Sequence, residues 1–218
     1  MQRLRLAGSL VAFVLAGAAF SSELAVIVFN PRSFDKGRVP PDWRIKVNHG
    51  RADIDSCAAG GDSCVRFKSV ASSFGIERGT EVNPNQTPFL TWRWKVTQLP
   101  QGGDFRHIAT DDQAAQVLVL FSDHRVLSYI WDSTAPKGAA DSNGSYFLVR
   151  VYTIVCESGP AQVGQWLAES RNVAADYRQA FGKQAPEIKG VRLQINSQHT
   201  GTSAESYFGE VAFRAQPL

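Results

Sequence analysis

Hydrophobic and polar residues alternate most clearly over residues 89–97. The apolar positions of this segment are Leu90, Trp92, Trp94 and Val96. Between them stand threonines and basic residues, which water solvates readily. A period of two is typical of a β-strand that buries one of its faces. The pattern therefore predicts a strand whose two tryptophans lie in the core.

Seven further segments have the composition of strands, and turn signals rich in Gly, Pro, Asn and Asp separate them. They cover residues 65–68, 72–77, 114–122, 126–131, 146–156, 190–195 and 206–214. Residues 114–122 and 146–156 are apolar on both faces over much of their length, as the central strands of a sandwich are. Many short strands predict an all-β architecture.

One segment, residues 173–181, has helical character. Its apolar residues recur every four positions, Asn172 precedes it as an N-cap, and Gly182 follows it as a stop. Together these elements predict a mostly β fold, a β-sandwich of jelly-roll type with one short helix near the C-terminal third. A lipocalin-like barrel is the alternative architecture.

The N-terminus has the pattern of an export signal. Arg3 and Arg5 precede a short apolar stretch, and an A-x-A pattern ends at Ala18. The apolar stretch is shorter than the ~20 residues that span a bilayer. We therefore predict a signal peptide over residues 1–18 and a single domain over residues 19–218. The mature protein would then be periplasmic or secreted, with no membrane span after cleavage.

Charge argues against a nucleic-acid partner. The 218-residue chain has a formal net charge of +3. The predicted signal peptide contains two arginines and no acidic residue, so the mature chain is close to neutral. The sequence also has no run of Lys and Arg, which nucleic-acid binding generally requires. We therefore expect no nucleic acid among the partners.

Three cysteines are present. Cys57 and Cys64 bracket small residues that suit a flexible loop, and in an oxidising compartment we expect these two sulfurs to form a disulfide. Cys156 ends an apolar run and is predicted to be a buried free thiol. No histidine stands at ligand spacing near the first pair, so the cysteines predict no metal site.

Ordered blocks along most of the mature chain carry a resemblance to a known family. The blocks include Trp-Arg-Trp-Lys-Val at 92–96, Leu-Pro-Gln-Gly-Gly-Asp at 99–104, Tyr-Ile-Trp-Asp at 129–132 and Thr-Gly-Thr-Ser-Ala-Glu at 200–205. In this order they resemble the domain of unknown function 3047 family of bacterial envelope proteins. The resemblance implies a jelly-roll sandwich that is similar in look to carbohydrate-binding modules. The name of the family assigns no activity to its members.

The chain departs from the family pattern just before the last block. The family has an Asp-rich stretch there, whereas residues 196–199 read Asn-Ser-Gln-His. Carboxylates at that place would suit calcium, and amides offer only uncharged oxygens. We therefore expect no cofactor, and calcium is kept only as a weak alternative.

Asp111 and Asp112 stand just before a predicted strand. They can act as calcium ligands or as one half of the carboxylate pair of a glycosidase. The competing interpretation is a charged turn that accepts hydrogen bonds from backbone N–H groups. Since no partner carboxylate stands at a suitable spacing, we favour the turn.

Tyr129, Trp131 and Asp132 form the second candidate group. The two rings share one face of a predicted strand, and the carboxylate follows at the strand end. Aromatic rings can stack on a sugar, and a neighbouring carboxylate can accept hydrogen bonds from its hydroxyl groups. Residues 137–145 are predicted to be a loop that forms one wall of this binding groove. The alternative, that both rings are core residues, stays open.

The sequence is compatible with three classes of function. The sequence contains none of the common nucleophile, metalloprotease or phosphate-binding motifs, so no catalytic residue is assigned. We expect an exported, non-catalytic module that binds a glycan or another envelope component. An envelope structural or assembly protein and a polysaccharide hydrolase or lyase are the alternatives.

Overall fold

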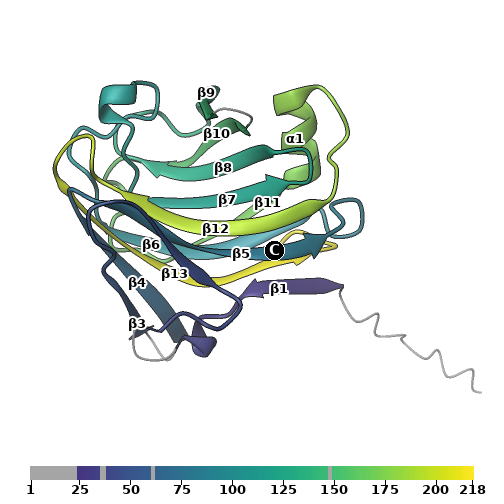
Figure 1. Cartoon of the computed structure of the whole chain (residues 1–218), viewed down its shortest axis with the longest axis horizontal. Helices are drawn as coiled ribbons and strands as arrows, with labels where there is room; N and C mark the ends of the chain where they lie inside the picture. The colour runs from purple at the N-terminus through teal and green to yellow at the C-terminus, as the bar shows by residue number, and fades with distance from the viewer. Residues whose placement is uncertain (1–23, 35–37, 60–61, 147–148) are drawn as a thin grey trace, which may run out of the picture.

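Two β-sheets packed face to face make up the fold of this computed structural model (Figure 1). The structure describes residues 24–34, 38–59, 62–146 and 149–218. The predicted signal peptide lies outside the described residues. None of the helices in the described ranges has both the length and the apolar content needed to cross a bilayer.

The first sheet has six strands in the order β11-β6-β13-β4-β3, with β1 paired to β13. Their bounds are β1 (Ala25–Phe29), β3 (Ile54–Ala59), β4 (Asp62–Val70), β6 (Phe89–Gln98), β11 (Leu167–Asn172) and β13 (Ser203–Arg214). All of these pairings are antiparallel.

The second sheet has seven strands in the order β2-β5-β12-β7-β8-β10-β9. Their bounds are β2 (Arg44–His49), β5 (Ser73–Val82), β7 (Ala115–Phe121), β8 (Arg125–Asp132), β9 (Ala140–Tyr146), β10 (Val149–Ser158) and β12 (Ile188–Asn196). The chain crosses between the sheets from β4 to β5, from β6 to β7 and from β12 to β13. This alternation makes the fold a jelly-roll sandwich, as predicted, and not a barrel.

Each strand predicted from the sequence overlaps an observed strand, and helix α1 (Val173–Phe181) has the predicted bounds. The bounds of this helix could be predicted from the sequence because its capping residues act on nearby backbone groups. The Asn172 side chain accepts a hydrogen bond from the Ala175 amide at 3.0 Å, and Gly182 closes the helix at φ 70°. Two short 3-10 helices, η1 (Pro31–Ser33) and η2 (Ile108–Thr110), complete the described elements.

Five strands were not predicted, namely β1, β2, β3, β9 and β11. Four of these, β2, β3, β9 and β11, lie at the edges of the sheets. Edge strands are held by pairing on one side, so they need no long apolar alternation. Strand β9 corrects the prediction that residues 137–145 form a loop, because residues 140–145 belong to this strand, which pairs with β10.

Aromatic rings from both sheets meet in the core. Trp92 and Trp94 of β6 are 1% and 0% exposed, and their ring centroids lie 5.3 Å apart in a T-shaped contact. Across the sandwich, Tyr129 lies 5.3 Å from Trp92, and Trp131 lies 6.0 Å from Trp94. The predicted core position of the two β6 tryptophans is confirmed.

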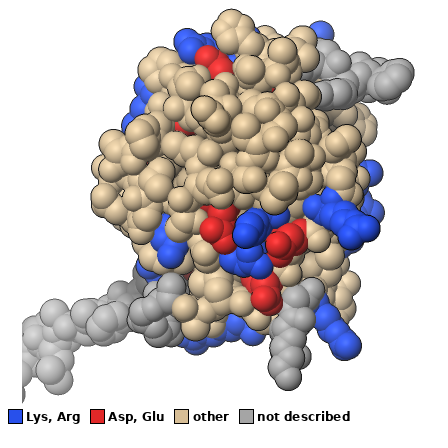
Figure 2. All heavy atoms as spheres, turned by 90° about the vertical axis from the view of Figure 1, so that its left-hand side faces the viewer, with Lys and Arg blue, Asp and Glu red and all other residues tan. Residues whose placement is uncertain are grey.

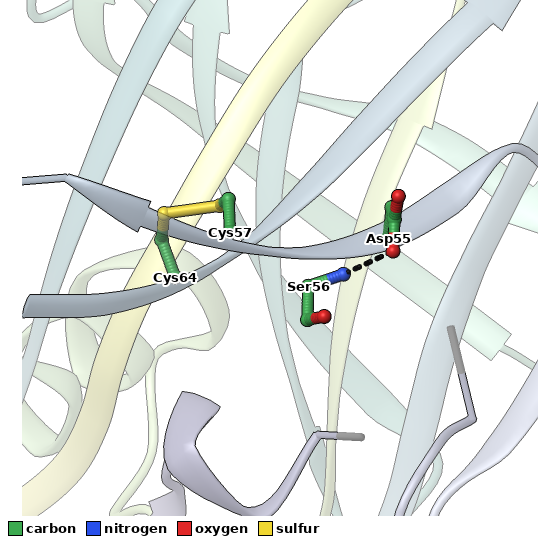
Figure 3. The surroundings of a disulfide bond; sticks show 4 residues. All are labelled: Asp55, Ser56, Cys57 and Cys64. Atoms are coloured by element: carbon green, nitrogen blue, oxygen red, sulfur yellow. Dashed lines mark hydrogen bonds between the residues drawn. A yellow bond between two sulfur atoms is a disulfide. The ribbon is translucent and has the colours of Figure 1, made fainter. Parts of the chain in front are cut away.

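A disulfide joins Cys57 of β3 to Cys64 of β4 (Figure 3). The two residues are directly opposite in the antiparallel pair, with Cα atoms 4.9 Å apart, which is a suitable separation for the bond. The predicted pairing is confirmed, and Cys156 is a buried free cysteine. The described residues between the paired cysteines, 58–59 and 62–63, are strand, where a flexible loop was predicted.

Candidate functional site

The face of the seven-stranded sheet that points away from the core carries a groove of about 470 Å³. We call it the outer groove. Alternation along each strand creates it, because one set of side chains enters the core and the other set faces outward. The polar side chains that line it include Gln116, Ser128, Thr153, Arg192, Gln194 and Asn196.

Strand register brings these outward side chains into rows. Arg192 of β12 is opposite Leu118 of β7, Leu118 is opposite Ser128 of β8, and Ser128 is opposite Thr153 of β10. At the usual spacing between strands, this row extends for about 14 Å. The groove is therefore assembled across four strands and not along one of them.

Glycine allows β5 and β12 to pair closely beside the groove. Gly75 of β5 is opposite Gln194 of β12. A Cβ atom at Gly75 would lie 2.3 Å from the Leu193 carbonyl oxygen, which is too close for any side chain. The close pairing of these strands therefore requires glycine here.

Amide side chains in the groove hold one another in fixed orientations. Gln194 donates from Nε2 to Oε1 of Gln116 at 3.3 Å, and Gln116 donates in turn to Oδ1 of Asn196 at 2.6 Å. Asn196 donates to the Asp111 carbonyl oxygen at 2.7 Å. The backbone amide of Gln113 also donates to Asn196, at 2.8 Å. Such a network reduces the side-chain entropy that would be lost when a ligand binds.

Two hydroxyl groups stand beside this network. Ser128 and Thr153 are 3% and 9% exposed and both line the groove. Their hydroxyl groups have no hydrogen-bond partner in the part of the chain that the structure describes. A hydroxyl can donate one hydrogen bond and accept others, so both groups are available to a polar ligand.

Asp111 is the one carboxylate among the described residues that line the groove. Gln113 donates to its Oδ1 at 2.7 Å. Burial raises the pKa of the Asp111 carboxyl group above its ordinary value, although this hydrogen bond and the neighbouring His199 oppose the shift. The groove therefore contains a single, partly buried acid.

Asp112 has a different environment from its neighbour. It is fully buried, and it accepts hydrogen bonds from the backbone amides of His199 at 3.2 Å and Thr200 at 2.7 Å. The segment that follows β6 and the turn between β12 and β13 thus meet at the left of Figure 1. The carboxylate of Asp112 therefore stabilises the turn between β12 and β13, and its buried side chain is not accessible to a ligand.

Figure 2 shows the end of the molecule that lies at the left of Figure 1. Uncharged residues form most of the middle and upper part of this face, a few charged residues lie along its top and left edges, and a cluster of acidic and basic residues lies in its lower part. The view gives no large single-sign patch of charge on this face.

Tyr129 and Trp131 do not form the surface platform that the sequence allowed. Both rings are 0% exposed. The Tyr129 hydroxyl donates to Oδ2 of Asp176 at 2.9 Å, and the Trp131 indole donates to the Gly159 carbonyl at 3.2 Å. The interpretation of these rings as a stacking surface is wrong in this structure, because their face of β8 packs against the other sheet.

The prediction that Asp132 binds a sugar is also wrong in this structure. Its side chain is fully buried and accepts backbone hydrogen bonds from Phe105 at 2.9 Å, Thr134 at 2.9 Å and Ala135 at 2.7 Å. These contacts fix the loop after β8 and join it to the loop after β6. A carboxylate with three backbone donors has little remaining capacity for sugar hydroxyls.

The residues that line the groove were not predicted as a site, because two of the strands that carry them were interpreted as apolar on both faces over much of their length. Gln116 and Thr153 interrupt segments that were predicted to be buried on both faces. Single polar residues at alternate positions, opposite a continuous apolar set, were the available signal. Among the described residues, no group of three or more His, Cys, Asp or Glu side chains is placed to hold a metal ion.

Comparison with protein families decides where the chain belongs. A family model described as Protein of unknown function (DUF3047) matches residues 29–212. The chain is a member of this family. The match includes every strand of the sandwich except the first residues of β1 and the last residues of β13. No curated protein matches the sequence of this DUF3047 member.

Solved structures resemble this DUF3047 domain distantly. Endoglucanase cel12A from Rhodothermus marinus aligns at 10% identity and a TM-score of 0.48, covering 91% of this chain and 100% of its own. The xyloglucanase domain of NopAA from Sinorhizobium fredii aligns at 8% and 0.47, covering 84% and 98%. A family 11 carbohydrate-binding module of Clostridium thermocellum aligns at 6% and 0.44, covering 88% and 95%. Likeness at this level carries no argument about ligands.

Proposed function

We propose that the outer groove binds a glycan and does not cleave it. The observation that carries this proposal is the hydrogen-bonded set of amides on β7 and β12, with the hydroxyl groups of β8 and β10 beside it. Sugar hydroxyl groups donate and accept hydrogen bonds, and so do glutamine amides and serine or threonine hydroxyls. A groove lined with such groups matches the chemistry of a neutral or acidic saccharide.

Apolar side chains complete the match. Leu118, Val126 and Ile130 also line the outer groove, between and beside its polar groups. The C–H faces of a sugar ring are apolar, so they would remove this surface from water while the hydroxyls reach the amides. Mixed lining of this kind is usual for sites that bind small, amphipathic ligands.

The set of acids in the groove favours binding over hydrolysis. Glycosidases generally use two carboxyl groups that lie ~5–9 Å apart across the scissile bond. Within the described lining of the groove, Asp111 is the one carboxylate. Asp132, another acid that the sequence suggested as a ligand contact, is buried and engaged by three backbone amides. Among the described residues, the outer groove itself therefore offers no second carboxylate to act as nucleophile or base, and Glu77, which lines the adjoining hollow, is engaged by Arg44 at 2.7 Å.

The proposed site of action is outside the cytoplasm. A disulfide such as Cys57–Cys64 persists in oxidising compartments and is rare in reducing ones. Together with the export signal predicted from residues 1–18, this supports a periplasmic or secreted protein. The glycan would then belong to the cell envelope or its surroundings.

A glycan array followed by calorimetry on the purified protein tests the proposal. Gln194→Ala removes a groove amide that is half-buried and donates to Gln116. Gln179→Ala, on the exposed side of α1, is the matched control. We expect a bound glycan whose affinity falls at least about fivefold in the first variant, as for loss of one to two hydrogen bonds, and is unchanged in the second.

Three results would contradict the proposal. One is the absence of binding to any glycan at millimolar concentration, and another is equal affinity in both variants. The third is release of reducing sugar from a bound polysaccharide, which would move the protein to the hydrolase class. An envelope assembly role would instead be favoured by binding to an envelope protein that Gln194→Ala does not weaken.

A further inference from the structure

Arg192 lies where two hollows of the sheet surface meet. It lines the outer groove and also a neighbouring hollow of about 230 Å³, and Leu118 and Val126 are shared in the same way. The second hollow extends the groove toward β2 and β5, where Arg44 and Glu77 line it. Arg192 is thus at the centre of one continuous depression.

The hydrogen-bonding capacity of this arginine is largely unused. A guanidinium carries several N–H donors. One terminal nitrogen donates to Oδ1 of Asn48 at 3.1 Å. The Nε atom is buried and has no hydrogen-bond partner among the described residues. The other terminal nitrogen lies 3.8 Å from Oε2 of Glu77, which is longer than a hydrogen bond.

The charge of Arg192 is also incompletely balanced. Glu77 forms its short contact, 2.7 Å, with Arg44 and not with Arg192. One carboxylate therefore faces two guanidinium groups. Their positions differ: the side chain of Arg44 is 81% exposed and solvated by water, whereas that of Arg192 is only 20% exposed. Lys189, which follows along the same depression, is already paired with Glu81 and Glu187.

Burial of a cation without a full set of partners is unfavourable. Removing a guanidinium from water costs free energy unless hydrogen bonds or an opposite charge replace the lost hydration. The same loss of hydration lowers the pKa of the Arg192 guanidinium from its ordinary value. An oxyanion that reached its terminal nitrogens would supply acceptors and an opposite charge there, and charge-assisted hydrogen bonds of this type are strong.

We propose that the glycan held in the outer groove is acidic, and that a carboxylate or sulfate group on one of its sugar units pairs with Arg192. This inference rests on the proposed glycan-binding function and adds the chemical class of the ligand. The amides of β7 and β12 would bind the neighbouring hydroxyls. Arg192 would then determine which glycans are accepted, since a neutral chain leaves its donors unpaired.

Calorimetry with three oligosaccharide probes of equal length tests the inference on the whole protein. The probes are an oligogalacturonate, its fully methyl-esterified form and a sulfated oligosaccharide. We expect the first or the third to bind at least about tenfold more tightly than the neutral ester. This preference should weaken as sodium chloride is added, because salt screens the ion pair. The comparison between carboxylate and sulfate identifies the anion.

Variants locate the effect. Arg192→Gln should remove most of the preference for the acidic probe while changing the affinity for the neutral probe by less than about threefold. Arg192→Lys keeps the charge and should retain part of the preference, because a lysine lacks the planar fork. Arg178→Gln, an exposed arginine of α1, makes the same change of charge away from the groove and should leave all affinities unaltered.

The outcomes separate the two proposals. If acidic and neutral probes bind the wild-type protein equally, the groove binds glycans but the role of Arg192 is wrong. The same conclusion follows if Arg192→Gln lowers both affinities to the same extent. If no probe and no glycan on the array binds, the proposed function is wrong and the inference about Arg192 is wrong with it.

Discussion

Replacing Trp131 by alanine tests whether this ring belongs to the core or to a binding surface. The side chain is 0% exposed and lies 6.0 Å from the ring of Trp94. Truncating a buried aromatic residue generally costs about 3–5 kcal/mol. The lost hydrogen bond to the Gly159 carbonyl should bring the cost toward the upper end of that range. We therefore expect Trp131→Ala to lower the free energy of unfolding by about 4–5 kcal/mol.

Urea denaturation followed by far-ultraviolet circular dichroism measures this change. Trp131→Phe retains most of the apolar volume and loses the indole N–H, so it should cost only about 1–2 kcal/mol. Trp166→Ala is the matched control, because Trp166 is only half-buried and should cost less than Trp131→Ala. A loss below about 1 kcal/mol for Trp131→Ala, together with lost glycan binding, would refute the core assignment.

Three further predictions follow from polar groups and the disulfide. Asp132→Asn replaces an acceptor by a donor opposite backbone N–H groups and should cost about 2–3 kcal/mol in urea unfolding; an unchanged midpoint would contradict the loop-fixing role. Burial and the nearby carboxylate of Glu157 raise the pKa of Glu169 from 4.5 to about 7. The folded chain then binds the proton more tightly than the unfolded chain. Stability therefore falls as pH rises from 4.5 to about 7, because Glu169 loses its proton over this range. Glu169→Gln should therefore gain stability over the wild type between about pH 5 and about pH 8, and a difference in stability that does not vary with pH would be evidence against this. Replacing Cys57 and Cys64 by serine should cost about 2.5 kcal/mol, the loop-closure value for a sequence separation of 7, with reduced wild-type protein as the comparison.

Local chemistry in the sequence determined several parts of this protein. The alternation over residues 89–97 predicted β6 and the burial of Trp92 and Trp94. The caps Asn172 and Gly182 defined α1, since both act on backbone groups within a few residues. These features depend on neighbours in the chain, so the sequence contains all the information they need.

Pairing at the sheet edges could not be derived in the same way. Strand β9 has the small and polar composition of a loop, and it becomes a strand because β10 offers it a partner. A hydrogen-bonded partner stabilises extended backbone whatever the side chains prefer. The sequence of such an edge strand does not state which partner it will meet.

The face that each strand turns toward the core was decided only by the tertiary structure. A period of two showed that Tyr129 and Trp131 share one side of β8, but it did not show that the opposite sheet covers that side. Once those rings enter the core, Ser128 must face the outer groove. Packing of the sheets therefore buries the face of Tyr129 and Trp131 that was expected to bind a ligand, and it exposes the face of Ser128 to the outer groove.

The candidate site itself is a product of long-range contacts. Asp112 binds the amide of Thr200, which is 88 positions away, and Gln116 binds Asn196, which is 80 positions away. The charge at Arg192 depends on Glu77 of another strand, which in turn is paired with Arg44. The sequence by itself determined the type of fold, the helix and the disulfide, because short-range patterns specify them. Only the tertiary structure decided which polar groups meet on the outer face, because that depends on the order and register of strands that are distant in the chain.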